Sequence, residues 1–354
     1  MAVQENPAYG VAPGLRFAYV LERNGRIFRN WSELRAWRPQ GGPVWVHLER
    51  DHHVADAWLR SESGLDPLVT EALLAEESRP RVEAVDEGLL IVLRGISRIV
   101  GEAESALGGD ADLVPVHMWV DGHRVITLRD QDHFLPALRD IRNTSLQGKG
   151  PARTGELLAI IAGSVIRDIE PVLDAMDNEM DALEDLILEL MDAPHDHTPD
   201  KALRHRISQL RRRAIHLRRY LTPQRDALNR LQGEECAWLT PRDRLLIRED
   251  TDRLVRFIEY LDAIRDRAVI LHDDLSGLVS ERIARNAIRM SKMSNRLTAI
   301  AALLLPPSVI AGLLGMNVGG IPMSQDPHGF SEISAIAISS SVVILVGLRL
   351  LKWL

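Results

Sequence analysis

The chain has 354 residues, a formal net charge of −7 and a single cysteine, Cys236. This length accommodates one sizeable soluble domain with an appendage. The negative charge argues against a nucleic-acid-binding protein, and one cysteine excludes an internal disulfide framework or a multi-cysteine zinc site. The mean hydropathy of −0.08 fits a mostly soluble protein with its apolar residues concentrated in one part of the chain.

The first part of the chain has the pattern of a mixed α/β domain. Runs rich in Val, Ile, Leu and Trp predict four strands, at Val44–Leu48, Leu89–Ile99, Val114–Val120 and Arg124–Leu128. Asp121-Gly122, between the last two runs, is typical of a hairpin turn. Apolar residues at helical spacing predict helices at Asp66–Glu76 and Asp132–Leu146. The clearest linker is Gly148–Pro151, so we expect a cytoplasmic α/β domain over residues 1–150.

Two helices of opposite charge are expected next, over residues 151–240. Glu156–Met191 has a helical apolar period, and ten acidic residues lie between Asp168 and Asp192. Lys201–Arg219 carries eight basic residues and no acidic one. Because the connection Ala193–Pro199 is short, we expect an antiparallel hairpin with complementary charge. Two independently solvated helices remain an alternative.

A single long helix is expected to follow, over residues 241–317. Pro241 suits a first helical turn, and from there to Leu305 only Gly277 disfavours a helix. A helix of ~60 residues or more would be ~90–100 Å long. Its last part is apolar, because no charged side chain occurs between Leu297 and Gln325. Eighteen residues cover ~27 Å, close to the thickness of the bilayer core, so a first membrane span is expected at about 297–315.

A second apolar run, Ile333–Leu348, predicts a second span within residues 332–354, after an extracytoplasmic loop over 318–331. Arg349 and Lys352 can snorkel at its end. Basic residues also crowd the beginning of the first span, namely Arg282, Arg285, Arg289, Lys292 and Arg296. The loop has no basic residue, so the positive-inside rule predicts that both termini are cytoplasmic.

One face of the long helix carries small or polar residues at a 3.5-residue period. Its members are Ser280, Ala284, Ala287, Ser291, Ser294, Thr298, Ala301, Leu305, Ser308, Gly312 and Gly315. Such a period keeps one face turned toward a common axis, as in a narrow polar pore lined by one helix from each of several subunits. The pore-lining candidates are Ser291, Ser294, Thr298, Ala301, Leu305, Ser308 and Gly312. Alternatively, small residues let membrane helices pack closely.

Three features could shape the path of an ion. Gly315-Met316-Asn317 follows the first span, and a ring of Asn317 carboxamides could hold a hydrated cation at the pore mouth. The tripeptide could instead be a helix C-cap. Leu305, the one bulky residue of the stripe, could form a hydrophobic gate or could pack against the second span. Asp326 and His328 in the outer loop are further candidates to contact an incoming metal ion.

These segments resemble a known family. Ser294–Ile300, Leu305-Pro306-Pro307 and Ile310–Asn317 are similar to the first membrane helix and signature of the CorA metal-ion transporter family. The resemblance extends over the chain, including Leu221–Asp226 in the helical hairpin. Val318–Pro322 looks like the corresponding loop of the zinc-transporting ZntB branch. Magnesium-transporting members usually have an aromatic residue before the signature, where this chain has Leu314, and acidic residues soon after it.

The resemblance implies a fold of the α+β class, with an α/β cytoplasmic domain, long helices forming a funnel, and two C-terminal membrane spans. It also implies a homopentamer in the inner membrane, with Gly315, Met316 and Asn317 at the selectivity ring. The implied function is divalent-cation transport, with zinc as the substrate, or else magnesium, cobalt, nickel or cadmium. The stripe offers no His, Cys or carboxylate ligands, so its chemistry does not select zinc.

The sequence has no phosphate-binding Walker motif, catalytic triad or carboxylate pair. We therefore expect no enzymatic activity, cofactor, nucleotide partner or nucleic-acid partner. A membrane-anchored scaffold that transports nothing remains an alternative from a different class.

Overall fold

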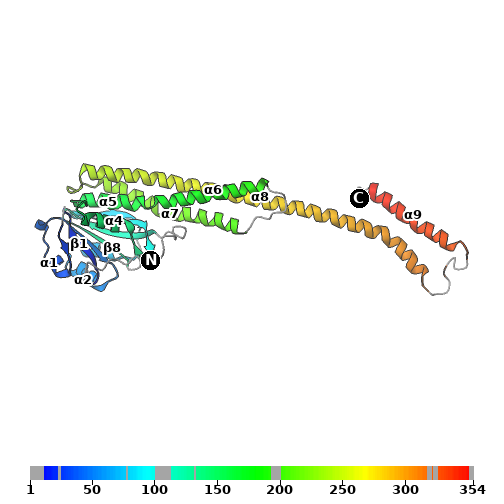
Figure 1. Ribbon diagram of the computed structural model, residues 1–354, viewed down its shortest axis with the longest axis horizontal. Coiled ribbons are helices and arrows are strands. Elements are labelled where there is room, and N and C mark those ends of the chain that lie inside the picture. Colours follow the sequence, from blue (N-terminus) through cyan, green and yellow to red (C-terminus); the bar gives the residue numbers. More distant parts are fainter. Residues whose placement is uncertain are drawn as a thin grey trace. The chain divides into compact units, whose positions relative to one another are not determined.

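The computed structural model of the chain describes residues 12–22, 25–76, 79–99, 113–130, 133–192, 201–316, 321 and 326–350 (Figure 1). These residues form two compact units. The first contains the described residues up to Asp192 together with 201–273, and the second contains the described residues from Asp274 onward. Helix α8, Pro241–Leu314, has 74 residues and belongs to both units. The fold class predicted from the sequence is confirmed.

A seven-stranded mixed sheet forms the centre of the first unit, in the order β2-β1-β3-β8-β7-β5-β4. Strands β3 and β8 are parallel, and the other neighbours are antiparallel. The strands of this sheet are β1 (Leu15–Val20), β2 (Ile27–Phe28), β3 (Val44–Glu49), β4 (Arg81–Val85), β5 (Gly88–Ile96), β7 (Leu113–Val120) and β8 (Arg124–Arg129). A separate pair consists of β6 (Arg98–Ile99) and β9 (His133–Phe134).

The four predicted strands are therefore confirmed, with small differences at their ends. The run predicted as Leu89–Ile99 is divided between β5 and β6. The helix predicted at Asp132–Leu146 begins only at Pro136, because His133–Phe134 pairs as β9. The helix expected at Asp66–Glu76 is Pro67–Leu74, and the side chain of Asp66 caps it by accepting from the backbone N–H of Leu68 at 2.7 Å.

Helices cover both faces of the sheet, which explains why every residue of β3 is buried. Val44, Val46 and Leu48 belong to a core cluster with residues of α1, α2 and α3. Trp45 and His47 alternate with them along the strand, and both hydrogen-bond to the hydroxyl of Thr127, each at 2.8 Å. The helices of the first unit, apart from α8, are α1 (Trp31–Arg35), α2 (His53–Ser61), α3 (Pro67–Leu74), α4 (Pro136–Leu146), α5 (Thr154–Arg167), α6 (Glu170–Asp192) and α7 (Lys201–Gly233).

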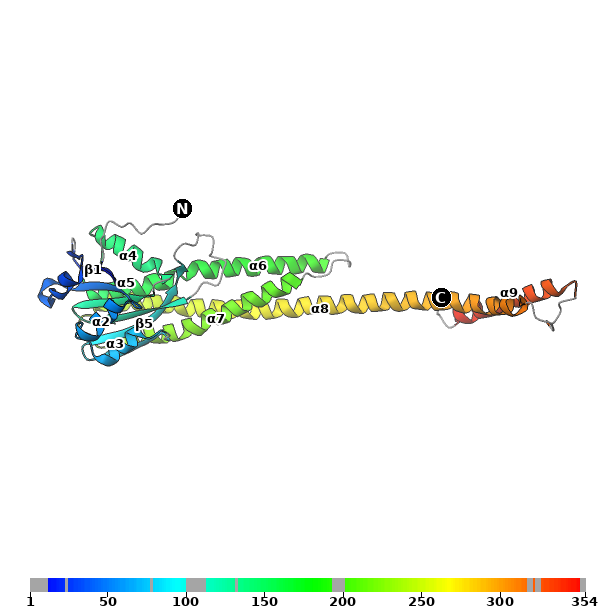
Figure 2. The same ribbon diagram turned by 90° about the horizontal axis from the view of Figure 1, so that it is seen from below.

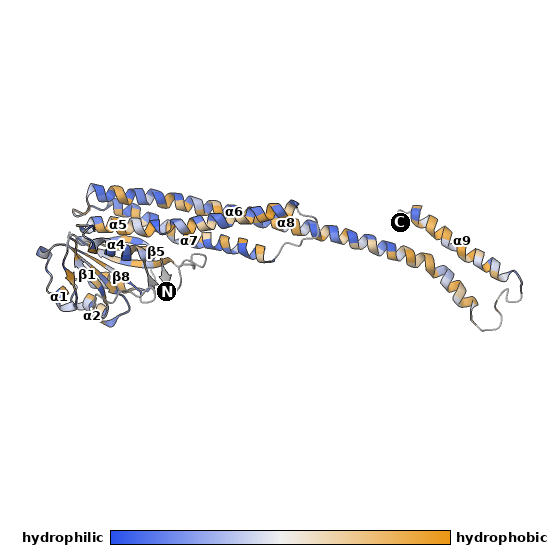
Figure 3. Cartoon of the chain, in the orientation of Figure 1, coloured by the Kyte–Doolittle hydropathy of each residue, from blue (hydrophilic) through white to orange (hydrophobic). Residues whose placement is uncertain are grey.

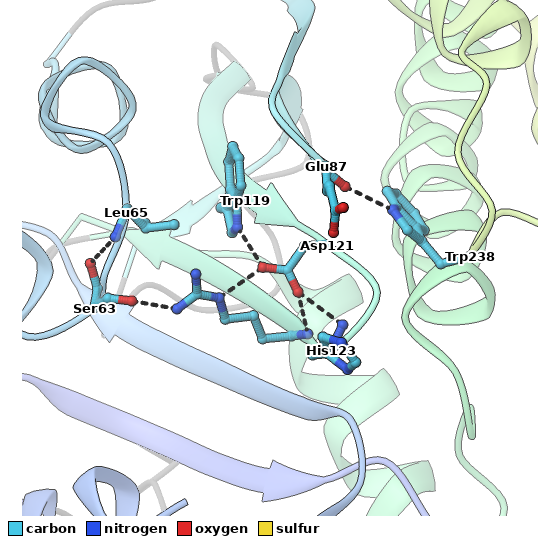
Figure 4. Close-up of polar contacts among 8 residues, drawn as sticks. Ser63, Leu65, Glu87, Trp119, Asp121, His123 and Trp238 are labelled. Atoms are coloured by element: carbon cyan, nitrogen blue, oxygen red, sulfur yellow. Dashed lines mark hydrogen bonds and ion pairs between the residues drawn. The ribbon is translucent and has the colours of Figure 1, made fainter. Parts of the chain in front are cut away.

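The predicted turn at Asp121-Gly122 joins β7 to β8 and is held by the Asp121 carboxylate (Figure 4). This carboxylate accepts from the indole N–H of Trp119 at 2.9 Å and from Arg124 Nε at 2.8 Å. Arg124 also donates to the backbone carbonyl of Ser63, which ties the hairpin to the segment before α3. On the other side, Trp238 donates to the carbonyl of Glu87 at 3.3 Å, so the segment leading into α8 contacts the sheet.

The first turn of α8 is fixed by Asp243, whose residue surface is only 1% exposed. Its carboxylate accepts from the backbone N–H of Thr240 at 2.9 Å and from the Thr240 hydroxyl at 2.6 Å, as in a capping box. Arg153 donates to both carboxylate oxygens, at 2.9 and 3.2 Å. Burial alone would raise the pKa of Asp243, but the hydrogen bonds from Arg153 and Thr240 outweigh it and lower the pKa. The long helix is thereby anchored beside the start of α5.

The acidic and basic helices α6 and α7 contact each other, and both run alongside α8 within the first unit (Figures 1 and 2). The segment predicted as one helix, Glu156–Met191, is divided into α5 and α6. Arg206 and Arg213 of α7 each lie 3.6 Å from Glu179 of α6. The prediction of complementary charge between these two helices is only partly right, because most of the charged contacts of α6 lie elsewhere.

Those contacts converge on Arg267 of α8. Its guanidinium donates to Asp177 at 3.0 Å, to both oxygens of Glu184 at 2.7 and 2.8 Å, and to Asp181. These three carboxylates occupy successive turns of one face of α6. Hydrogen bonds to Glu184 and Asp181 raise the pKa of Arg267 despite the opposing effect of burial, so it stays charged. The acidic face of α6 is thus turned toward α8, which charge composition along the sequence could not reveal.

Candidate ion pathway

The second unit contains the two candidate membrane spans. Both α8 and α9 (Gly329–Leu350) contain an 18-residue window that is apolar enough to cross a bilayer. Figure 3 shows the end of α8 and most of α9 in orange and white, whereas the helices of the first unit alternate between blue and orange. The predicted second span, Ile333–Leu348, lies inside α9.

The predicted stripe lies on a face of α8 that α9 leaves uncovered. In the apolar part of the helix, Ala301, Leu305, Ser308 and Gly312 are all exposed. The residues partly covered there are Ala302, Leu303, Pro306, Pro307, Ile310 and Leu314. These covered positions recur with the same period but on the other side of the helix. A single chain thus covers one side of this span only in part and leaves the stripe facing outward.

Three hydroxyl groups on the stripe donate back into the helix. Thr298 Oγ1 donates to the carbonyl of Ser294 at 2.9 Å, Ser308 Oγ to that of Leu304 at 2.7 Å, and Ser280 Oγ to that of Ser276 at 2.9 Å. Each hydroxyl has one hydrogen, so its oxygen remains available as an acceptor. Acceptors on this face could receive hydrogen bonds from the water shell of a cation. Ser291 and Ser294 are exposed on the same face, before the span.

Leu305 is 62% exposed in the chain, and its side chain therefore does not pack tightly against α9. This observation argues against the alternative in which Leu305 serves only to hold the second span. Two prolines follow it, and α8 continues through both of them to Leu314.

Helix α8 ends at Leu314, directly before the signature tripeptide. The backbone N–H of Gly315 donates to the carbonyl of Ala311 at 2.9 Å, and Met316 is 51% exposed. Asn317, the main candidate for the selectivity ring, lies outside the described residues. The roles of all three residues remain predictions.

Asp326 and His328 lie immediately before α9. One carboxylate oxygen of Asp326 accepts from the backbone N–H of His328 at 2.8 Å, which forms a turn directly before the helix. Both residues are exposed. Among the residues that the structure describes, no group of three or more His, Cys, Asp or Glu side chains is placed to hold a metal ion. An ion contact at Asp326 or His328 remains a prediction.

One polar contact between the spans could not be anticipated from the sequence pattern. Ser341 of α9 donates to the carbonyl of Leu303 at 3.3 Å. The only hint in the sequence is that Ser341 ends a run of three serines inside an apolar segment.

Residues 40–352 match the family described as CorA-like Mg2+ transporter protein. The chain belongs to the CorA family. It is 34% identical over 321 residues to the "Divalent cation transporter CmaX" of Pseudomonas aeruginosa, covering 90% of each chain. It is also 32% identical over 317 residues to the "Zinc transport protein ZntB" of Pectobacterium carotovorum, covering 88% of each. The resemblance noted in the sequence is thereby confirmed.

The solved structure of full-length CmaX has a TM-score of 0.70 to this chain at 32% identity, and the match covers 97% of this chain and 99% of that one. The two membrane spans therefore belong to the fold of a CorA-family divalent-cation transporter and are not core helices of a soluble protein.

Proposed function

We propose that this chain carries zinc across the inner membrane through a pore lined by one α8 helix from each subunit of a homopentamer. The observation that carries this proposal is the division of α8 into two faces. One face is partly covered by α9. The other face is exposed, and along its centre the small and hydroxyl-bearing stripe residues, with Leu305 among them, run between the exposed apolar side chains of Leu304 and Val309. Further copies of the same helix are the natural cover for the second face.

The orientation proposed places both termini in the cytoplasm. Five basic residues lie between Arg282 and Arg296, directly before the first span on α8, and Arg349 lies at the end of α9. Basic residues concentrate on the cytoplasmic side of membrane spans, which favours this orientation. In the same arrangement the Gly315-Met316-Asn317 segment lies at the outer mouth, where an Asn317 ring would meet an incoming ion.

Zinc is favoured by the likeness to ZntB and by the loop Val318–Pro322. A second candidate is magnesium, because the family description names Mg2+ and the stripe carries hydroxyl oxygens in place of zinc ligands. Hydroxyl oxygens that accept from a water shell suit either hydrated ion. The choice between the two metals therefore depends on transport measurements.

The test is transport by the full-length protein in proteoliposomes, with zinc or magnesium outside and with or without a proton gradient. We expect zinc flux that exceeds magnesium flux and that Asn317→Ala largely abolishes without changing oligomer size, because the substitution deletes the acceptor ring. A scaffold would give the flux of empty liposomes for both metals. Full zinc flux through a correctly assembled Asn317→Ala protein would contradict the assignment of the ring.

A further inference from the structure

Two consecutive prolines, Pro306 and Pro307, lie inside the membrane-spanning part of α8. Proline has no N–H, so the carbonyls four residues earlier, at Ala302 and Leu303, lose their donors within the helix. In a bilayer, water is not at hand to satisfy such a carbonyl, and leaving it without a partner is costly. A donor from a neighbouring helix would therefore stabilise this part of α8.

The structure places such a donor at Leu303. The hydroxyl of Ser341, from α9, lies 3.3 Å from the Leu303 carbonyl. It lies in a recess whose other lining residues are aliphatic side chains and a proline, including Leu303 and Pro307 on α8 and Ala337 and Leu345 on α9. The chain of α9 returns beside the end of α8 at this level (Figure 1).

The same hydroxyl has a second acceptor. It lies 3.1 Å from the carbonyl of Ala337 in its own helix. A serine hydroxyl has a single hydrogen, so the two carbonyls share or compete for it. Rotation of one side chain can thus couple α9 to the proline segment of α8 or release it.

We propose that Ser341 is a positioning residue for the gate: its hydroxyl replaces the N–H that Pro307 lacks and so holds the proline segment of α8 against α9. Leu305 lies between Leu303 and Pro307 in sequence but on the uncovered face, so anchoring the covered face fixes the direction in which Leu305 points. The link to ion flux rests on the proposed transport function, whereas the anchor itself does not.

A double-mutant cycle tests the anchor, because Pro307→Ala restores the missing N–H donor to Leu303 and makes Ser341 redundant. Spin labels on Leu313→Cys and Val346→Cys, both exposed positions, would report the distance between α8 and α9 in a Cys236→Ser background. Labelled full-length protein is diluted with unlabelled protein so that distances within one chain dominate.

In the protein that keeps Pro307, we expect Ser341→Ala to broaden the distribution of distances between the two labels and to raise basal zinc flux severalfold. In the Pro307→Ala protein, we expect it to do neither. Ser341→Thr, which keeps a hydroxyl, should behave as the wild type. Ser340→Ala is the matched control, since Ser340 donates to Ala337 at 2.8 Å within its own helix.

Equal effects of Ser341→Ala in both backgrounds would overturn the anchor, and so would the absence of any change in distance in the Pro307 protein. An unchanged flux with a broadened distance would overturn the role at the gate. A third outcome separates the two proposals. If Ser341→Ala broadens the distance distribution only where Pro307 is present, and no protein, including the wild type, transports metal, then the anchor is supported and the proposed transport function fails.

Discussion

Replacing Arg267 with Gln should weaken the attachment of α6 to α8. The substitution removes the cation that binds Asp177, Asp181 and Glu184, and it leaves three carboxylates on one helix face without compensation. The Arg267 side chain is 33% exposed, so solvent screening reduces each contact to a fraction of its value in a dry interior. The lost network contributes ~1 kcal/mol, and each of the two like-charge pairs among the three carboxylates adds ~0.2–0.5 kcal/mol, so the expected loss of stability is ~1.4–2 kcal/mol.

For a unit of this size, each kcal/mol shifts Tm by about 2–4 °C, so ~1.4–2 kcal/mol corresponds to a decrease in Tm of roughly 3–8 °C. Circular dichroism of the full-length protein in detergent would measure it at about 0.05 M and about 0.5 M salt, and the higher salt should reduce the difference because it screens the charges. Arg265→Gln is the matched control, since the ion pairs of Arg265 in the described part of the chain are with Asp262, at 3.1 Å, and Asp266, at 2.8 Å, both in its own helix. Equal decreases for the two variants, or a decrease at Arg267 that salt does not change, would refute the reasoning.

Two further predictions concern the gate and acid stability. If Leu305 forms a hydrophobic gate, Leu305→Ser should let water into it and raise basal cation leak severalfold while the oligomer stays intact. Leu304→Ser should not raise the leak. Reduced flux from a weakened oligomer in Leu305→Ser would contradict the gate hypothesis. Burial, with Arg129 and Arg16 nearby, lowers the pKa of His47 to about 3, so folding stability should decrease as the pH falls from about 6.5, the unfolded value, toward 3. The expected decrease in folding stability between pH 7 and pH 5 is ~2 kcal/mol. In thermal melts, the Tm of His47→Gln should depend less on pH than the Tm of the control His123→Gln. Parallel curves for the two variants would count against a neutral buried His47.

The elements set by local patterns could be predicted from the sequence. Alternating and apolar runs located β3, β5, β7 and β8, and the unbroken helical pattern from Pro241 predicted α8. The stripe was also predictable, because its period is a local property of one helix. Strand β9 was missed because two residues carry too little pattern. Strand β1 was missed although five of its six residues pair with β3.

Contacts between distant segments could not be predicted in the same way. Arg267 lies 83 residues from Glu184, and the choice between α7 and α8 as the partner of α6 depends on how three helices rotate about their axes. The prediction of complementary charge between α6 and α7 was only partly right for this reason. Ser341 lies 38 residues from Leu303, and only the packing of α9 decides which of three adjacent serines meets the carbonyl that Pro307 leaves without a donor.

The two faces of the α8 span set different requirements on its surroundings. The covered face needs a donor for Leu303 and aliphatic neighbours, and α9 of the same chain supplies both. The opposite face exposes hydroxyl oxygens, and neither lipid tails nor α9 offers them a polar partner. Water in a pore formed by further copies of α8 would satisfy these oxygens, and a hydrated cation could pass along them without shedding its inner waters. On this argument, α9 completes the span within one subunit, and assembly completes the pathway.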